Sequence, residues 1–119
     1  MRSEHAIAAL SALAHADRLA AFRLVLRAGR DGLPSGGIAE ALGIQPTRMS
    51  FHLSTLERAG VLHSERDGRH IRYAVNFKIM RDLLGFLTDE CCAGHPEICA
   101  DLMKAAPQAR TAKKLEETT

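Results

Sequence analysis

The chain has 119 residues, of which 46% are hydrophobic and 25% charged, a composition typical of one small globular domain and not of a fibrous or disordered protein. Its formal net charge of +2 is compatible with a polyanionic partner but is too small to indicate one. The alanine-rich start is interrupted by His15, Asp17 and Arg18, which argues against a signal peptide or a membrane span, so we expect a cytoplasmic protein with no membrane partner.

Helical periodicity dominates the first half of the chain. Residues 3–13 form a short amphipathic segment, and a second helix begins near Asp17 and carries an apolar stripe at i, i+3, i+7 from Leu19. After a turn rich in glycine, proline and serine, residues 38–42 form a short third helix, with Ser35 as its expected cap.

A fourth helix is predicted over residues 46–59, where Pro46 suits the first helical position. Met49, Leu53 and Leu56 fall on one apolar side of it. The opposite side is therefore free to meet a partner.

From Val61 the periodicity changes to two, and Asp67 and Gly68 form a predicted two-residue turn between two strands. Asn76 then caps a fifth helix over residues 77–92. The predicted fold class is mainly α with a β-hairpin (α+β), with one domain over residues 1–106, including a short helix over 97–106, and a flexible tail over 107–119.

The third and fourth helices have the order and the tight turn of a helix-turn-helix, whose second helix enters the major groove of DNA. The hairpin adds basic residues beside it, as a wing that reaches an adjacent groove or the backbone. The alternative is that these side chains form an ordinary solvated surface, or that the winged helix binds another protein. The predicted DNA-contacting residues are Gln45, Thr47, Arg48, Ser50, Phe51 and Ser54 of the helix, and Arg66, Arg69 and His70 of the hairpin.

Three segments resemble, in order and in spacing, the ArsR type of metalloregulatory repressors: ALAHADRLAAFRLVLRAG its second helix, IAEALGIQPTRMSFHLSTLERAGVL its helix-turn-helix and ERDGRHIRYAV its wing. The resemblance implies a winged helix-turn-helix homodimer, paired through its first and fifth helices. Such a dimer binds double-stranded operator DNA as a repressor and releases it when a ligand binds.

Phe51 departs from this pattern, because the family often has histidine there. An apolar contact, for example with a thymine methyl group, would replace a hydrogen bond to a base edge. His52 lies nearer the apolar side, and we expect it to be packed and hydrogen-bonded inside the protein.

All three cysteines, Cys91, Cys92 and Cys99, follow one another closely, which in a reducing compartment indicates a metal or redox site. Residues 94–96 can fold the chain back so that three thiols converge, and thiolates select soft ions. Trivalent arsenic and antimony form three bonds to sulfur. The spacing resembles the site of some arsenite-responsive ArsR relatives, whereas the helix-three cysteine motif of the founding arsenic sensors is absent. The expected effector is arsenite, As(III), or Sb(III), with no organic cofactor.

Other uses of the thiols stay open. His95 as a fourth ligand would give a site for zinc or cadmium, and a Cys92–Cys99 disulfide would give a redox sensor. The cysteines could also be small buried hydrophobes. A small thiol oxidoreductase is the enzymatic alternative, but the sequence has no Cys-x-x-Cys, no phosphate loop and no acid/base pair, so we expect no enzyme.

Overall fold

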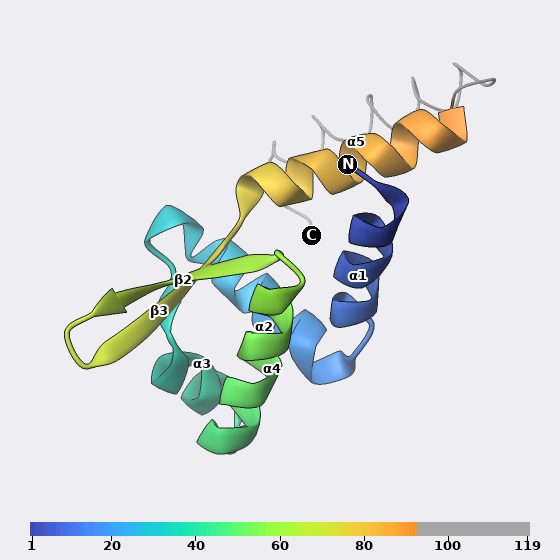
Figure 1. Ribbon diagram of the computed structural model, residues 1–119. Helices are drawn as coiled ribbons and strands as arrows, with labels where there is room; N and C mark the ends of the chain where they lie inside the picture. The colour runs from blue at the N-terminus through green and yellow to red at the C-terminus, as the bar shows by residue number, and fades with distance from the viewer. Residues whose placement is uncertain (93–119) are drawn as a thin grey trace, which may run out of the picture. The chain divides into compact units, whose positions relative to one another are not determined.

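The computed structural model describes residues 1–92, with side chains as far as Thr88 (Figure 1). These residues belong to two compact units, Met1–Leu83 and a second that begins at Leu84. The elements in chain order are α1 (Ser3–Leu13), α2 (Ala16–Arg27), a 3₁₀ turn η1 (Gly29–Asp31), β1 (Leu33–Pro34), α3 (Ser35–Leu42), α4 (Pro46–Arg58), β2 (Leu62–Asp67), β3 (His70–Val75) and α5 (Phe77–Cys92). The predicted helices and hairpin, and with them the winged helix-turn-helix fold, are confirmed. The predicted helix over 97–106 and the tail over 107–119 lie outside the described residues.

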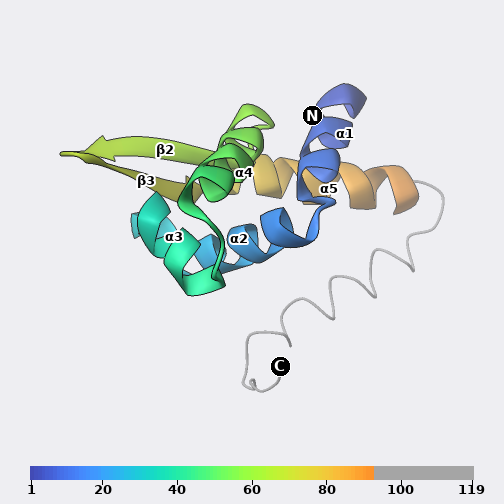
Figure 2. The ribbon, with the colours of Figure 1, turned by 90° about the horizontal axis from the view of Figure 1, so that it is seen from below.

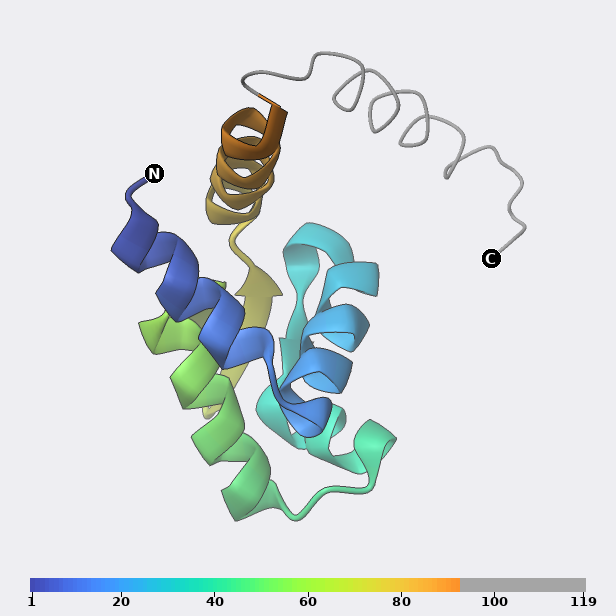
Figure 3. The same cartoon turned by 90° about the vertical axis from the view of Figure 1, so that its right-hand side faces the viewer.

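The core of the first unit is aliphatic. On α4 the predicted stripe of Met49, Leu53 and Leu56 is completely buried, and α4 packs against α2, α3 and β2. On α1 the buried residues are Ala6, Ala9 and Ala12. Because their side chains are small, α1 can approach α4 closely, and the two helices lie side by side (Figure 3).

The sheet has three antiparallel strands in the order β1-β3-β2, and its hairpin projects beyond the helices of this unit (Figure 2). The register pairs Asp67 with His70, so the two turn residues are Gly68 and Arg69. The predicted turn at Asp67 and Gly68 is therefore wrong by one residue. Gly68 has a φ of 65°, and a left-handed backbone at the first turn position favours glycine there, so the strand extends through Asp67.

The two-residue strand β1 was not predicted, because it is too short to show any periodicity. It pairs Leu33 with Tyr73 of β3. Gly32, with a φ of 68°, lies directly against the backbone carbonyl of Tyr73, where a Cβ atom would overlap it. Arg72 donates hydrogen bonds to the carbonyl oxygens of Asp31 and Gly32, both at 3.1 Å. This arginine is therefore used to hold β1 and η1 against the hairpin.

Of the two predicted helix caps, one is confirmed and one is wrong. Ser35 is the first residue of α3 and not its cap; Pro34 holds the cap position and no side chain caps this helix. Asn76 was correctly predicted to cap α5, since its Oδ1 accepts a hydrogen bond from the Ile79 amide at 3.2 Å. In α2, which begins at Ala16, His15 is the cap residue. In the part of the chain that the structure describes, no helix has the length and hydropathy needed to cross a membrane.

Candidate nucleic-acid interface

The turn between α3 and α4 places the outer side of α4 on the surface. Gly43 ends α3 in the left-handed conformation, and the Ile44 amide donates to the Ala39 carbonyl at 3.0 Å. Pro46 then starts α4, where its missing N–H needs no acceptor. Because the stripe described above fixes which side of α4 is buried, the rotation of the helix about its axis is fixed as well.

The predicted DNA-contacting residues of the helix lie on that outer side. Gln45, Thr47, Arg48, Ser50 and Phe51 are exposed, and Ser54 is half-buried. Phe51 is 62% exposed, so this polar face also carries one large apolar ring. This face therefore presents hydrogen-bonding groups, a cation and one apolar ring to a partner.

Two of these residues already have partners within the protein. Arg48 donates to the Asp17 carboxylate, with Nη2 and Oδ2 3.0 Å apart, while its side chain remains 60% exposed. Ser54 accepts a hydrogen bond from Arg58 at 3.2 Å. Contact with DNA would require either side chain to exchange this partner for a base or a phosphate.

The tip of the hairpin is basic and exposed. Arg66, Arg69 and His70 surround the turn, and within residues 1–88 neither arginine forms an ion pair. Beside the half of the hairpin nearest its tip lies an open groove of about 460 Å³, lined by Arg30, Asp31, Glu65, Arg66, Asp67 and Arg72. Its three carboxylates offset its three arginines, so the groove as a whole offers phosphate little net attraction.

His52 is buried, as predicted, with 6% of its surface exposed. The predicted internal hydrogen bond is wrong: Nε2 lies 3.7 Å from Asp17 Oδ2, too far for one, and Nδ1 has no hydrogen-bond partner among the described residues. Burial, then the nearby charges of His15 and Arg18, lower the pKa of His52 below its ordinary value, against an opposing effect of Asp17. The imidazole is therefore neutral at pH 7 and is not placed to contact DNA.

The sequence did not point to Asp17 as a partner of the DNA-facing helix. It stands 31 positions before Arg48 and carries only the local signal of a helix start. The contact becomes visible only when α2 and α4 are packed together.

Cys91 and Cys92 belong to the last turn of α5, but their side chains, His95 and Cys99 lie outside the described residues. Convergence of the three thiols stays a prediction.

Comparison with known proteins agrees with a DNA-binding role. A helix-turn-helix domain family matches residues 13–65. The chain is 27% identical over 90 residues to the HTH-type transcriptional regulator YgaV of Escherichia coli K12, covering 76% of this chain and 89% of that protein. It is 37% identical over 73 residues to a probable mercury resistance operon repressor of Streptomyces lividans, covering 61% of this chain and 56% of the repressor.

Solved structures share the fold. One is the homodimeric winged helix-turn-helix DNA-binding domain of Mb0332 from Mycobacterium bovis, a possible ArsR-family regulator, with a TM-score of 0.60 and 22% identity over 77% of this chain and 82% of that one. Another is the AntR antimony-specific transcriptional repressor, with a TM-score of 0.53 and 27% identity over 73% of this chain and 78% of that one. All of these proteins are described as transcriptional regulators or DNA-binding domains.

Proposed function

We propose that this chain, a transcriptional regulator of the ArsR-like winged-helix type, is a homodimeric cytoplasmic repressor that releases its operator when trivalent arsenic or antimony binds the thiolates of Cys91, Cys92 and Cys99. The DNA-binding half rests on one observation above all. The inner side of α4 is completely buried while every predicted contact on its outer side, from Gln45 to Phe51, is exposed.

The exposed side chains of α4 and of the hairpin tip offer different kinds of contact to DNA. Thr47 and Ser50 offer hydroxyl groups to bases or phosphates, and Arg48 can bond a guanine edge or a phosphate. The Phe51 ring provides an apolar surface of the kind that packs against a thymine methyl. Arg66 and Arg69 add sequence-independent attraction at the hairpin tip.

Dimerisation is supported by apolar side chains that a monomer leaves in water. On α1, Ile7 is 60% and Leu10 is 42% exposed, and on α5, Leu84 is 58% exposed. A small domain with 4% aromatic residues gains much by covering such groups. Two copies also suit a pseudo-palindromic operator, whose half-sites lie about 34 Å apart. The homodimeric state of the Mycobacterium bovis domain supports the same arrangement.

The effector is inferred from the donor set. Three thiolates within nine positions, two of them ending α5, suit a soft ion that takes three sulfur ligands. The names of two similar proteins, a mercury resistance repressor and an antimony-specific repressor, support a thiophilic effector. Binding at the end of α5 would alter the position of that helix and, through the dimer, the spacing of the two α4 helices. The coupling free energy between two such sites is about 1–3 kcal/mol, whereas a shift from almost fully bound to almost fully released DNA needs about 5.5 kcal/mol. Both effector sites of a dimer are therefore required.

Thiol counting tests the site directly. Reduced protein is mixed with arsenite, and the remaining free thiols are titrated under denaturing and native conditions. We expect all three thiols per chain to be protected by one arsenic. Protection of two or fewer would contradict a three-sulfur site and would favour the redox pair Cys92 and Cys99 or a site completed by His95.

A further inference from the structure

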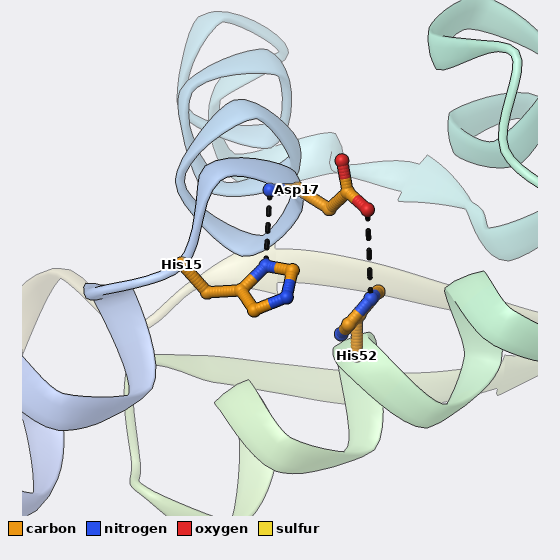
Figure 4. Close-up of side chains that lie close together, drawn as sticks. All are labelled: His15, Asp17 and His52. Carbon is orange, nitrogen blue, oxygen red and sulfur yellow. Dashed lines mark hydrogen bonds and ion pairs between the residues drawn. The ribbon is translucent and has the colours of Figure 1, made fainter.

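Three side chains with metal-ligating groups meet where α2 begins and packs against α4 (Figure 4). His15 is the residue before α2, Asp17 lies in its first turn, and His52 lies on the buried side of α4. One ligand atom from each lies within 4.8 Å of the other two. Folding thus brings together two imidazoles and a carboxylate that are up to 37 positions apart in the sequence.

We propose that His15, Asp17 and His52 form a binding site for a divalent transition-metal cation of the Zn²⁺, Co²⁺ and Ni²⁺ class. Two nitrogens and one carboxylate oxygen are a borderline donor set, whereas Mg²⁺ and Ca²⁺ take oxygen ligands and the softest ions take thiolates. The set is therefore chemically distinct from the three cysteines and would select a different ion.

The separations are close to those that such an ion requires. With bonds of 2.0–2.1 Å to nitrogen, two ligand atoms of a tetrahedral zinc site lie about 3.3 Å apart. His52 Nε2 and Asp17 Oδ2 are already 3.7 Å apart. Because His15 is exposed and precedes the helix, its ring can shift by the remaining distance of about 1–1.5 Å without disturbing the core. His52 is held in place by packing, and Asp17 by its ion pair with Arg48.

His52 has its Nε2 atom available as a ligand, because no described residue forms a hydrogen bond with it. Its ring is 6% exposed, yet neither nitrogen makes a hydrogen bond to any residue that the structure describes. Buried polar groups are nearly always paired, so a buried imidazole in this state is unusual.

Binding a cation has two identifiable costs. His15 Nδ1 accepts a hydrogen bond from the Asp17 amide at 3.1 Å, and ligation through either ring nitrogen gives up this cap. Asp17 Oδ2 is also the partner of Arg48 at 3.0 Å, so a cation and this guanidinium compete for one carboxylate. Arg18 and Arg48 both face His52 and add repulsion. Removing the Arg48 charge should therefore strengthen cation binding.

This competition connects the site to α4. A cation that binds Asp17 releases Arg48 from its ion pair. The effect of this release on DNA binding rests on the proposed function, which places Arg48 at the DNA. Cation binding itself can be measured without DNA, so its failure and a failure of operator binding are distinguishable.

The test uses full-length protein in which Cys91, Cys92 and Cys99 are all changed to serine, so that thiolates cannot bind the probe. Co²⁺ is titrated, and its visible absorption and equilibrium dialysis report ligand type and stoichiometry. We expect one Co²⁺ per chain with a nitrogen and oxygen ligand spectrum. His15→Ala and His52→Gln should each weaken binding by at least about tenfold. The matched control His63→Gln, at an exposed histidine of β2, should leave it unchanged.

His15→Ala is decisive, because an exposed residue outside the core can be removed without unfolding the protein. Arg48→Gln should bind Co²⁺ several-fold more tightly than the parent. The proposal is overturned if the cysteine-free protein binds no stoichiometric Co²⁺, or if His15→Ala binds as tightly as the His63→Gln control.

Discussion

Asp17, in the first turn of α2, holds the guanidinium of Arg48, in the first turn of α4, with 3.0 Å between Oδ2 and Nη2. The pair is partly exposed, at 60% for Arg48 and 31% for Asp17, so it contributes about 0–1 kcal/mol to stability. Its larger effect is electrostatic: it partly neutralises a cation on the surface proposed to meet DNA and places a carboxylate near the phosphates.

Asp17→Asn should therefore bind DNA more tightly, by roughly three- to tenfold at low salt, because the carboxylate no longer opposes phosphate or holds Arg48. Fluorescence anisotropy with a labelled promoter fragment measures this. Glu4→Gln on α1, which removes a carboxylate from an ion pair with Arg2 away from the DNA-facing surface, is the control and should change little. Weaker DNA binding by Asp17→Asn, with an unchanged melting temperature, would show that Asp17 instead positions Arg48 for DNA.

The basic side chains of α4 and the hairpin should differ in how they respond to salt. Arg48→Ala should lose about 1–3 kcal/mol of binding free energy and some sequence preference. Arg66→Ala and Arg69→Ala should weaken binding to all sequences and each reduce the slope of log K against log salt by about one. Lys78→Ala on α5, where the lysine pairs with Asp82, is the control. A slope that neither hairpin variant alters would remove the wing from the interface.

Phe51 offers a way to separate binding from folding. Because its ring is 62% exposed, Phe51→Ala should leave the melting temperature within about 2 °C of the parent. It should nevertheless weaken operator binding, since an apolar contact is lost. Phe51→His should change which base is preferred, measured by competition among operators that differ at single positions. Unchanged affinity and preference in both variants would place Phe51 outside the interface.

Among the described glycines, Gly32 has the least room for a side chain. Gly32→Ala adds a Cβ that overlaps the Tyr73 carbonyl and forces a positive φ on alanine, so we expect a loss of at least about 2 kcal/mol in urea unfolding. Gly36→Ala is the control: it lies in α3, has open space around its Cβ and should stabilise the protein by about 0.5–1 kcal/mol. Equal unfolding midpoints for the two variants would contradict the close packing of β1 on β3.

The sequence predicts most of this fold because its helices are separated by clear end signals, such as Pro46 and Asn76, and because the stripe from Met49 to Leu56 fixes the orientation of α4. It misses β1, whose two residues carry no periodicity and whose first residue, Leu33, pairs with Tyr73, 40 positions later in the chain. It places the hairpin turn one residue early, because it assigns Asp67 to the turn, whereas Asp67 is the last residue of β2 and pairs with His70.

The surroundings of His52 show why a site is harder to predict than a fold. The burial of this histidine follows from its place near the apolar stripe, but its missing hydrogen bond depends on how far Asp17 of another helix can reach. The group of His15, Asp17 and His52 has no motif spacing, because its members are joined by packing alone. The cysteine cluster, in contrast, can be recognised from the sequence, because its three members lie within nine positions.

The most direct test of the central claim is release of a promoter fragment by As(III), titrated under reducing conditions and followed by anisotropy, with Sb(III), Cd(II) and Zn(II) in parallel. We expect As(III) and Sb(III) to release DNA from the unaltered protein, and Cys→Ser variants at 91, 92 or 99 to bind DNA normally but remain bound when As(III) is added. The account would be contradicted if As(III) released DNA from these variants, or if Zn(II) and not As(III) released DNA from the unaltered protein.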